Sequence, residues 1–585
     1  MQKQQGSSLI QVLPPDVARK ISAGEVIERP SSVVKELVEN SIDAGSSRID
    51  VELVEGGKTL IRVADDGAGI APDDLGKVFL KHATSKIATT EDLEAIGTLG
   101  FRGEALASIG AVSIARIVSC ARGAGQGAEI EVKGGDRGKH KYVGAPEGTQ
   151  VEVKELFYNV PARRKFLKST PAEMSHISEV LTKLALSHPE VHFVFLHNGR
   201  EVFNLPSAPS LKERVTTYYG EELARDLIPI SSREQGLEVT GFALAPTHSR
   251  TNTRMQFVFL NGRPIRDSGL THAINAAYRT LLPPGRLPVI FLSLNIDPPS
   301  IDVNVHPTKI EVRFKEASRV YGQVLQAIKK ALDQFQPGLA SPTAPSGTEA
   351  TPVIPRSAIP KRPHSHGTSR VPGGGVSGAL LPKTSAVTAG REAAGIEHGR
   401  FLQLHSSYII EETPKGINII DQHALHEAAL YRDIKGTIQE RTLSSQRLLI
   451  PELLELSPAD FFRILELKDT LEKLGLELEE FGRNSIIVRS VPQILKDVII
   501  KELIEGFLED TKEGSAGDQM LDRIIKVMAC KGAIKSGHRL NAQELIALLE
   551  RRKDDIPLTH CPHGRPTTLF FSLEELDKQF KRTGK

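Results

Sequence analysis

The stretch Val33-Val-Lys-Glu-Leu-Val-Glu-Asn-Ser-Ile-Asp-Ala44 decides the fold of the N-terminal part of the chain. Its apolar residues recur at helical spacing after Pro30, a favoured first-turn residue, and they predict an amphipathic helix over Pro30–Asp43. At about 100° per residue, Glu36, Asn40 and Asp43 fall within one polar sector of this helix. An amide oxygen can bind Mg²⁺, and a carboxylate one turn away can serve as a general base toward water. Taken alone, the same pattern also fits a solvated helix face.

Two glycine-rich segments follow the helix. The segment Asp65-Asp66-Gly67-Ala68-Gly69-Ile70 comes directly after the predicted strand Leu60–Ala64. An aspartate at a strand end can accept a hydrogen bond from the exocyclic amine of adenine, and the glycines permit close approach of the backbone. The segment Gly97-Thr-Leu-Gly100-Phe-Arg-Gly103 precedes an apolar helical stretch, where free N–H groups favour phosphate. An ordinary Asp-Gly turn and an ordinary loop remain the alternatives for each segment alone.

Two further segments contain a lysine and a hydroxyl. His82-Ala-Thr-Ser-Lys86 supplies both groups between the two glycine-rich segments. Gly56-Gly57-Lys58-Thr59 looks like the end of a phosphate-binding P-loop, but Glu52 stands where that motif requires glycine. The second segment is therefore predicted to be a hairpin turn.

Composition limits the class of protein. The 585 residues hold 74 Lys+Arg and 72 Asp+Glu, a net charge of +2, and 39% hydrophobic residues, as in soluble globular proteins. The length predicts about three to four domains. The chain has only three cysteines, no apolar run of about 18 residues and no secretory signal, so a cytoplasmic protein without a membrane span is expected. The near-neutral charge argues at first against a nucleic-acid partner.

The segment Pro337–Arg400 differs from the rest of the chain. It contains 9 Pro, 10 Gly and no aromatic residue, which predicts a disordered linker. The linker carries a net +4, residues 401–585 a net −4 and residues 1–336 a net +2. The total charge therefore conceals a basic tether, which is either a solvated spacer or a segment that follows a phosphate backbone weakly and in a salt-sensitive way.

Helical and strand patterns mix without βαβ alternation, so the predicted fold class is α+β with several domains. Before the linker, the pattern predicts helices and strands at Ala172–Ser187, Arg48–Val54, Ser113–Ser119, Thr149–Lys154, Leu237–Ala243, Gln256–Leu260, Ser268–Tyr278, Val289–Asn295, Lys309–Phe314 and Ala317–Phe335. After the linker, it predicts elements at Asn418–Asp421, Ala459–Leu474, Ser485–Val491, Gln519–Lys535 and Asn541–Leu549.

The N-terminal segments, together with Asp302-Val-Asn-Val-His-Pro-Thr-Lys309, resemble the motifs of the gyrase–Hsp90–histidine kinase–MutL ATPase superfamily, and within it those of the MutL family. The resemblance implies a Bergerat-type ATPase sandwich over 1–210, with helices on a mixed sheet, and a ribosomal-S5-like transducer domain over 211–336. The disordered linker over 337–400 would then lead to an α+β dimerisation domain over 401–585, with a regulatory subdomain inserted at about 452–530.

The resemblance also implies roles for single residues. Glu36 would be the general base, Asn40 would bind Mg²⁺ and Asp65 would bind the adenine of ATP. Lys309 would reach the terminal phosphate from the second domain, as a catalytic cation. The other nucleotide contacts would be Gly67, Gly69, Thr84, Lys86, Gly97, Gly100, Phe101, Arg102 and Gly103. ATP would order the lid around Gly100–Gly103 and bring two N-terminal domains together.

A second set of candidate residues lies after the linker. If a helix begins near Gln422, His423 and Glu427 share one face and can share one metal ion. Cys561-Pro-His563 places a thiolate and an imidazole on the same side of an extended segment. Such a mixed set suits Mn²⁺ or Zn²⁺. An N-capping Asp421 and a buried structural Cys561 are the alternatives.

These residues, together with Ala529–Gly537, resemble the endonuclease site of the MutL proteins that nick DNA. The resemblance implies Asp421 as a catalytic residue and His423, Glu427, Cys561 and His563 as metal ligands. Arg432 stands where the family pattern has a second glutamate, and Asp433 follows it. The departure weakens a second metal site or recruits Asp433 instead. It supports an alternative function, a non-nuclease matchmaker with a structural C-terminal domain.

Binding segments for partners are implied as well. Gln446-Arg-Leu-Leu-Ile-Pro451 resembles a sliding-clamp-binding motif, with Gln446, Leu448, Leu449 and Pro451 as contacts, although a strand ended by proline is the alternative. Arg163–Lys168 is a basic cluster suited to DNA or to a structural role near the nucleotide, and Arg263 and Arg266 are weaker candidates for DNA contact.

The resulting expectation is an ATP-switched homodimer in DNA mismatch repair that couples mismatch recognition to strand incision. Its partners would be DNA, a MutS mismatch sensor and a sliding clamp, and it would associate with the nucleoid during repair. An Hsp90-like chaperone or a topoisomerase subunit could share the first three motifs. Residues 401–585 hold no evident topoisomerase cleavage motif, and residues 1–35 hold no histidine for a histidine kinase.

Overall fold

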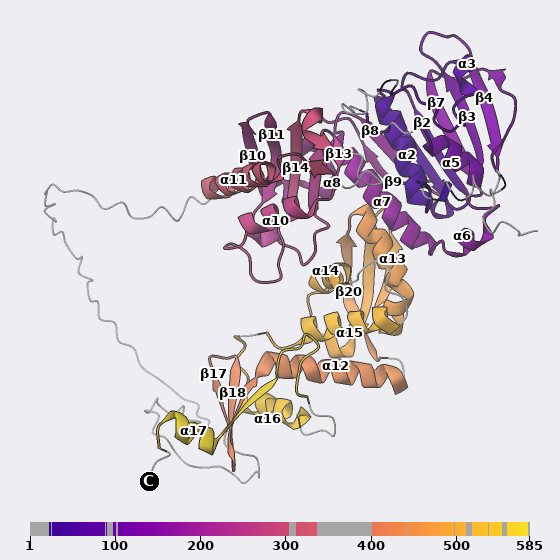
Figure 1. Cartoon of the computed structure of the whole chain (residues 1–585). Helices are drawn as coiled ribbons and strands as arrows, with labels where there is room; N and C mark the ends of the chain where they lie inside the picture. Colours follow the sequence, from indigo (N-terminus) through magenta and orange to yellow (C-terminus); the bar gives the residue numbers. More distant parts are fainter. Residues whose placement is uncertain are drawn as a thin grey trace, which may run out of the picture.

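The computed structural model describes residues 26–87, 98–100, 103–302, 312–335, 401–440, 443–495, 498–510, 518–535, 537–552 and 558–582, and also Pro14, Ile21, Ala23, Gly24 and Thr89. The predicted linker 337–400 lies outside the described residues. The described chain is α+β throughout, as predicted (Figure 1). No described helix is long and apolar enough to cross a membrane.

A nine-stranded sheet forms the N-terminal part of the structure, in the order β5-β4-β3-β7-β2-β1-β8-β9 with β6 beside β4. Only β1 and β8 pair in parallel. The strands are β1 (Arg48–Val54), β2 (Leu60–Asp65), β3 (Ile114–Cys120), β4 (Gly127–Lys133), β5 (Asp136–Arg137), β6 (Lys141–Val143), β7 (Gly148–Lys154), β8 (His192–His197) and β9 (Arg200–Leu205). The short turn Glu55–Gly57 joins β1 to β2, with φ of +67° at Gly56, so the expected hairpin turn is confirmed.

Helices α2 (Pro30–Asp43), α5 (Ala105–Val112) and α7 (Thr170–Ser187) pack against this sheet (Figure 1). Helix α2 has the bounds that the sequence predicts, and it buries Val33, Val34, Leu37 and Val38. Helix α7 begins where the Ser169 side chain caps it by accepting a hydrogen bond from the Ala172 amide.

Helix α6 (Pro161–Lys165) carries part of the basic cluster. Arg163 donates to the Ile27 carbonyl and Arg164 pairs with Glu155, which favours the structural role for these two residues.

A five-stranded sheet follows, in the order β10-β11-β14-β12-β13. Its elements are β10 (Leu227–Glu234), β11 (Leu237–Leu244), β12 (Gln256–Leu260), β13 (Arg263–Pro264), β14 (Ile290–Ile296), α10 (Ser268–Ala277) and α11 (Ala317–Phe335). Within the predicted strand Lys309–Phe314, only Arg313–Phe314 is described as a strand, β16, which pairs with β15 (Ile301–Asp302).

The C-terminal region contains two smaller sheets. The first has the order β17-β18-β19-β23, built from Phe401–Leu404, Tyr408–Thr413, Gly416–Asp421 and Thr568–Ser572. The second has the order β20-β22-β21, built from Ser445–Glu455, Ser485–Pro492 and Glu477–Phe481. Their helices are α12 (Gln422–Glu440), α13 (Pro458–Lys473), α14 (Ile500–Asp510), α15 (Asp518–Gly532), α16 (Ala542–Arg551) and α17 (Leu573–Gln579). Helix α12 begins at Gln422, as the proposed metal pair requires.

Candidate functional site

The polar face of α2 meets a cation from a distant segment. Lys86 Nζ lies 2.8 Å from Asn40 Oδ1 and 2.6 Å from Asp43 Oδ2. The structure therefore brings Lys86 to Asn40 and Asp43 of α2, although the sequence had placed this lysine in a separate motif. The Asn40 oxygen faces a positive charge, as a magnesium ligand does.

Asp43 also holds the start of the second glycine-rich segment. Its two carboxylate oxygens accept hydrogen bonds from Leu99 N, at 2.7 Å, and Gly100 N, at 2.9 Å. An added Cβ at Gly100 would lie 3.2 Å from Lys86 Nζ. The exposed N–H groups predicted to bind phosphate are thus bound to a carboxylate in this state, and Asp43 is a functional candidate that the sequence named only as part of the helix face.

The first glycine-rich segment packs against the end of α2. Asp65 accepts hydrogen bonds from Ser41 Oγ, at 2.8 Å, and from Gly67 N, at 2.9 Å. Burial raises the pKa of Asp65 above its ordinary value, although these hydrogen bonds oppose the shift. Gly69 has φ of +69°, and an added Cβ would lie 2.1 Å from the Cys120 carbonyl oxygen, so no side chain fits there.

Glu36 lies one turn before Asn40 and is half-buried. Its carboxylate is 3.6 Å from Lys35 Nζ, which also pairs with the buried Glu39 at 3.1 Å. Thr84 Oγ1 accepts from Lys86 N at 3.1 Å. Gly103 has φ of +62° and packs closely on Ala83. The predicted contacts Gly97, Phe101, Arg102 and Lys309 lie outside the described residues.

Arg263, at the start of β13 in the second domain, reaches into this region. Its Nη2 donates to the carbonyl of Thr98, two residues before Gly100, and its side chain is buried. Burial lowers the pKa of Arg263, while Glu39 and Asp43 oppose the shift. The prediction that Arg263 contacts DNA is therefore wrong, because a buried guanidinium cannot reach a duplex. Arg266, three residues later, is exposed and pairs with Glu179.

The second candidate site surrounds the N-terminus of α12. The Asp421 carboxylate accepts from Ala424 N at 3.0 Å and so caps the helix. His423 Nδ1 lies 2.9 Å from the Ile534 carbonyl oxygen, and His426 Nδ1 accepts from Ile534 N at 2.9 Å. The contact with the Ile534 carbonyl fixes the His423 ring and leaves the Nε2 of this ring for another partner. Burial lowers the pKa of His426 to about 4, so that ring is neutral near pH 7.

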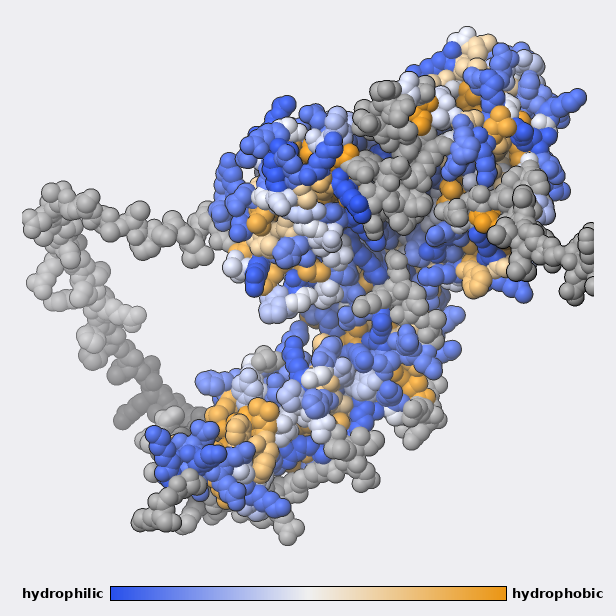
Figure 2. Space-filling model, in the orientation of Figure 1, coloured by the Kyte–Doolittle hydropathy of each residue, from blue (hydrophilic) through white to orange (hydrophobic). Residues whose placement is uncertain are grey.

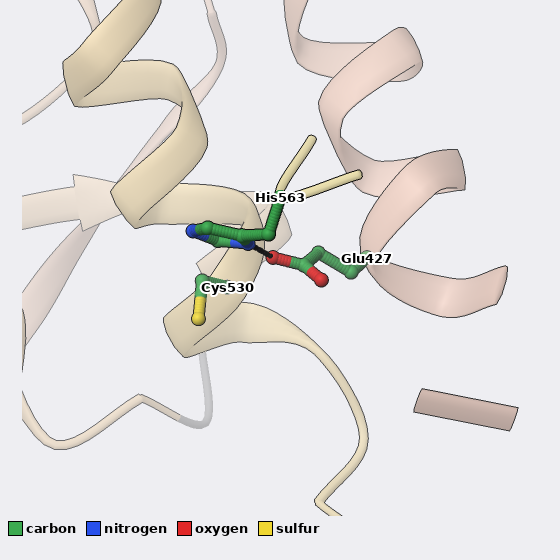
Figure 3. Close-up of side chains that lie close together, drawn as sticks. All are labelled: Glu427, Cys530 and His563. Carbon is green, nitrogen blue, oxygen red and sulfur yellow. Dashed lines mark ion pairs between the residues drawn. The ribbon is translucent and has the colours of Figure 1, made fainter. Parts of the chain in front are cut away.

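Three side chains from three segments meet beside α12 (Figure 3). Glu427, Cys530 and His563 bring ligand atoms within 4.8 Å of one another, and Figure 3 shows the His563 ring facing the Glu427 carboxylate with Cys530 beside them. Glu427 Oε1 lies 2.5 Å from His563 Nδ1. A carboxylate, a thiol and an imidazole are a donor set for Zn²⁺ or Mn²⁺. Cys530 lies within the Ala529–Gly537 segment, but the sequence alone does not identify it as a ligand.

The charge states within this cluster depend on its partners. Although burial opposes it, hydrogen bonds from His563 and Cys561 hold the pKa of Glu427 below its usual value. The hydrogen bond to Glu427 raises the pKa of His563. Burial, reinforced by the charge of Glu427, raises the pKa of Cys530 to about 11. Without a bound cation the thiol is therefore protonated near neutral pH.

Arg432 and its neighbour take part in a different contact. The Arg432 guanidinium donates to Asp433 and to the carbonyl of Arg551, the last residue of α16. Asp433 also lies 3.7 Å from the Arg551 guanidinium. Both residues therefore tie α12 to the end of α16, and the structure shows neither of them among the clustered metal-ligand atoms.

The segment proposed for clamp binding lies in β20. The pairing of β20 with β22 is interrupted between Arg447 and Glu452. Within this gap Leu449 is 99% exposed and Ile450 is 80% exposed, so two large apolar side chains face solvent. The segment is a strand, but β20 continues through Pro451 to Glu455 and does not end at the proline as that alternative expected. The exposed bulge distinguishes it from an ordinary strand.

Three parts of the chain match known families. Residues 28–156 match the histidine kinase-, DNA gyrase B- and HSP90-like ATPase family. Residues 215–333 match the C-terminal domain of DNA mismatch repair proteins, and residues 401–540 match the MutL C-terminal dimerisation domain.

Curated relatives match almost the whole chain. DNA mismatch repair protein MutL of Paramagnetospirillum magneticum is 37% identical, over 98% of this chain and 100% of the relative. The MutL of Pseudomonas entomophila is 38% identical, over 99% of each chain. Among solved structures, the Aquifex aeolicus MutL ATPase domain complexed with ADP is 32% identical and covers 51% of this chain and 98% of its own, with a TM-score of 0.37.

Proposed function

The chain belongs to the MutL family of DNA mismatch repair proteins, with an ATPase domain and a C-terminal dimerisation domain, and we propose that it is an ATP-switched homodimer that couples mismatch recognition to DNA incision. The proposal includes a metal-dependent nicking activity of its own. The observation that carries this part is the convergence of Glu427 of α12 with Cys530 and His563. Asp421 ends β19 directly before this helix, and His423 lies in its first turn. The partners would be DNA, a MutS mismatch sensor and a sliding clamp.

We assign the ATPase roles from the contacts of α2. Asn40 Oδ1 would hold Mg²⁺, because it already faces the Lys86 ammonium at 2.8 Å. Glu36 would orient and deprotonate the attacking water from one turn earlier on the same helix. Asp65 would accept from the adenine amine, with Ser41 holding its orientation. Bound Mg²⁺ would neutralise phosphate charge, and Lys309 would add a cation from the second domain.

The contacts of Asp43 support a specific switching step. In the structure Asp43 binds the N–H groups of Leu99 and Gly100. Phosphate oxygens would compete for the same donors and for Lys86. ATP would thus release this loop from Asp43 and order it around the phosphates, which is the change that would signal to a second N-terminal domain.

Arg263 supplies the first test of the link between the two N-terminal domains. Replacing it with alanine removes a charged hydrogen bond to the Thr98 carbonyl, worth about 1.5–3 kcal/mol. We expect kcat/KM for ATP hydrolysis to fall at least about tenfold. Steady-state hydrolysis measured without DNA checks this, with Arg263→Lys as the conservative variant and Arg266→Ala as the matched exposed control. Equal rates in Arg263→Ala and Arg266→Ala would contradict the role.

For incision, the burial and contacts of the acidic and imidazole groups support a metal site. Glu427 is buried, at 1% exposed, and the only described carboxylate within the three-residue cluster. His423 is oriented by the Ile534 carbonyl, and Cys561 is buried beside Glu427. A divalent cation held there would polarise a phosphodiester and supply a hydroxide nucleophile, with Asp421 orienting the reacting groups.

The metal affinity of this cluster should rise with pH. His563, whose pKa is raised by Glu427, and Cys530, with a pKa of about 11, must each lose a proton to bind metal. Lowering the pH from about 8 to about 6 should therefore weaken Co²⁺ or Zn²⁺ binding. The thiolate-to-cobalt absorption band measures this directly. Its loss in Cys530→Ser but not Cys561→Ser would assign the thiolate ligand to Cys530, and the reverse outcome to Cys561.

The direct test of the proposed nicking activity is conversion of supercoiled plasmid to open circles by the full chain with Mn²⁺. No product across Mn²⁺, Zn²⁺ and Mg²⁺ at several pH values would leave the alternative, a matchmaker with a structural C-terminal domain. The position of Arg432 favours that alternative, because the second carboxylate of the family pattern is missing.

Two surfaces complete the proposal. The exposed bulge at Leu449 and Ile450 would bind an apolar groove of a sliding clamp, with Gln446, Leu448 and Pro451 as flanking contacts. The edge strand β23 exposes apolar side chains on both faces, and Figure 2 shows apolar residues gathered at this end of the molecule. The exposed residues there are Leu402, Leu404, Tyr408, Leu569, Phe570, Phe571 and Leu573. We assign the dimer contact to this surface.

A further inference from the structure

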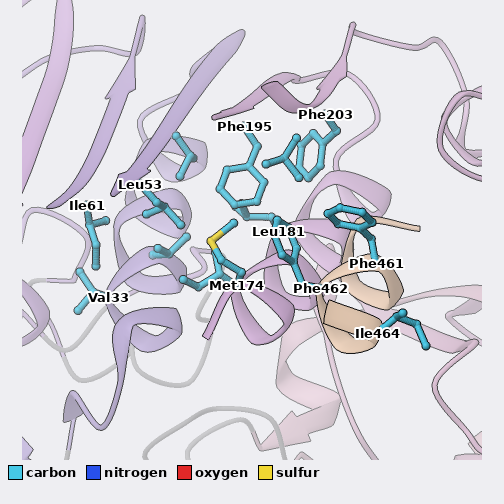
Figure 4. Close-up of a cluster of buried hydrophobic side chains, with 14 of the residues drawn as sticks. Val33, Leu53, Ile61, Met174, Leu181, Phe195, Phe203, Phe461, Phe462 and Ile464 are labelled. Carbon is cyan, nitrogen blue, oxygen red and sulfur yellow. The ribbon is translucent and has the colours of Figure 1, made fainter. Parts of the chain in front are cut away.

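One buried apolar cluster joins the ATPase domain to the C-terminal region, although more than 250 residues separate them in sequence. Helix α13 packs along α7. Phe461 is 4% exposed and Phe462 is 7% exposed, and both belong to the cluster that contains Leu181 and Phe203 of the ATPase domain. Figure 4 shows the two phenylalanines turned toward these residues. The Phe462 ring meets the His197 ring edge-on, with centroids 5.9 Å apart.

Polar contacts surround this cluster. Ser175 Oγ on α7 donates to the Ala459 carbonyl at 3.2 Å. In the turn between β21 and β22, Arg483 pairs with Glu201 of β9 at 2.6 Å. The next residue, Asn484, donates to the Val202 carbonyl at 2.8 Å. The contact therefore has an apolar centre and a hydrogen-bonded rim, as protein interfaces have.

The same C-terminal subdomain also touches the second N-terminal domain. At the end of α14, the Leu508 carbonyl accepts from Arg254 Nη1 at 2.7 Å, and Glu509 lies 3.4 Å from the Arg286 guanidinium. Thr251 and Asn252 donate to Glu509 as well. Cations at a helix C-terminus neutralise its partial negative charge and its unpaired carbonyls.

We propose that the subdomain of β20, β21, β22, α13 and α14 is a docking module for the N-terminal half of its own chain. It binds the ATPase domain through α13 and the second domain through α14, and so holds these two domains in the orientation in which Arg263 reaches Thr98. The apolar bulge at Leu449 is exposed in this docked state. The proposal does not depend on nicking activity.

The burial of each contact shows which contacts contribute most to holding the module in place. Each buried phenylalanine contributes more to docking than the Arg483–Glu201 pair does, because apolar burial stabilises strongly. The Arg483 side chain is 69% exposed, and an exposed ion pair contributes little. Two phenylalanines with a polar rim form the kind of interface that domains within one chain make and release. The module is therefore held mainly by α13 and can undock.

Undocking should change nucleotide turnover. Because the module bridges two domains, its release frees the second domain to move and weakens the Arg263–Thr98 contact. Linkage then requires that nucleotide binding and docking affect each other equally. The docked module is in this way a physical connection between the C-terminal region and the ATPase site.

The first experiment cross-links the full-length protein. Glu201→Cys with Arg483→Cys replaces the ion pair by two thiols, and a short bismaleimide should join them within one chain. The single variants control for reaction at Cys120, Cys530 and Cys561. We expect a product of monomer mass with altered mobility in the double variant only. No such product, or a product of twice the mass, would overturn docking within one chain, the second by assigning it to another copy.

The second experiment removes the apolar anchor in that same cysteine background. Phe462→Asp should reduce cross-linking at least tenfold and alter the KM for ATP, whereas Ile499→Asp should leave both unchanged. Ile499 is a matched control, since it is 55% exposed and directly precedes α14, at the end of this helix opposite Leu508. Phe462→Ala should have a smaller effect in the same direction, which separates loss of docking from misfolding. Equal cross-linking in Phe462→Asp and Ile499→Asp would overturn the proposal.

Discussion

Replacing Glu36 with alanine should abolish ATP hydrolysis and leave ATP binding nearly intact. The carboxylate lies on the polar face of α2, one turn before Asn40, and is partly open to solvent, where a water molecule can reach it. General-base catalysis contributes about 10²–10⁴-fold, so turnover should fall by that factor. Binding should persist because the adenine and phosphate contacts come from other residues. Phosphate release and equilibrium binding of a fluorescent ATP analogue measure the two quantities.

The matched variant is Asp65→Ala, which should show the opposite pattern. Asp65 is held by Ser41 and Gly67 beneath the proposed adenine position, and its loss should abolish binding itself. If Glu36→Ala hydrolysed ATP at the wild-type rate, the general base would have to be another carboxylate. Glu39 is unsuited to that role, since it is 5% exposed and paired with Lys35.

Replacing Asp421 with asparagine should eliminate metal-dependent nicking without unfolding α12. Asp421 caps this helix by accepting from Ala424 N at 3.0 Å, and asparagine caps helices about as well as aspartate. The substitution thus preserves the cap and removes the negative charge that the chemistry requires. Nicking of supercoiled plasmid with Mn²⁺ should fall at least about 10²-fold, while thermal unfolding should be unchanged.

Asp433→Asn, on the helix that Asp421 caps, is the control. The Asp433 carboxylate is engaged by Arg432 and Arg551, so this variant should nick as the wild type does. The reverse result, loss in Asp433→Asn and activity in Asp421→Asn, would show that Asp433 has replaced the missing glutamate as a ligand. If both variants kept wild-type nicking activity, an acidic metal site at this position would be contradicted.

The sequence predicts well the elements that carry these candidate residues, where each element is set by its own residues. Helix α2 has its predicted bounds, and the polar face follows from helical geometry alone. The start of α12 at Gln422 is likewise a local matter, since the apolar strand β19 ends at an aspartate that can cap a helix. Periodicity and capping are short-range properties, and a single sequence contains them in full.

Contacts between distant segments are the part that could not be predicted. Cys530 joins Glu427 and His563 from positions about 100 and 30 residues away. The resemblance over Ala529–Gly537 includes this cysteine, but helix α15 itself does not show that its thiol meets the other two side chains. The burial of Arg263 could not be predicted for the same reason, because it depends on how the second domain contacts the loop at Thr98. The only local signal was the tight turn at Asn261-Gly262, which aims the following arginine. The positive charge of Arg263, considered alone, suggested a contact with DNA instead.

The exposed edge strand β23 makes the stability of this protein depend on its concentration. An isolated C-terminal region would leave Leu569, Phe570 and Phe571 in water beside unpaired backbone groups. Association that covers them stabilises the folded state by mass action, so the midpoint of thermal unfolding increases with protein concentration. At low protein concentration the folded state would thus be less stable. In a cell that makes few copies, a larger fraction of the molecules would be unfolded and open to proteolysis.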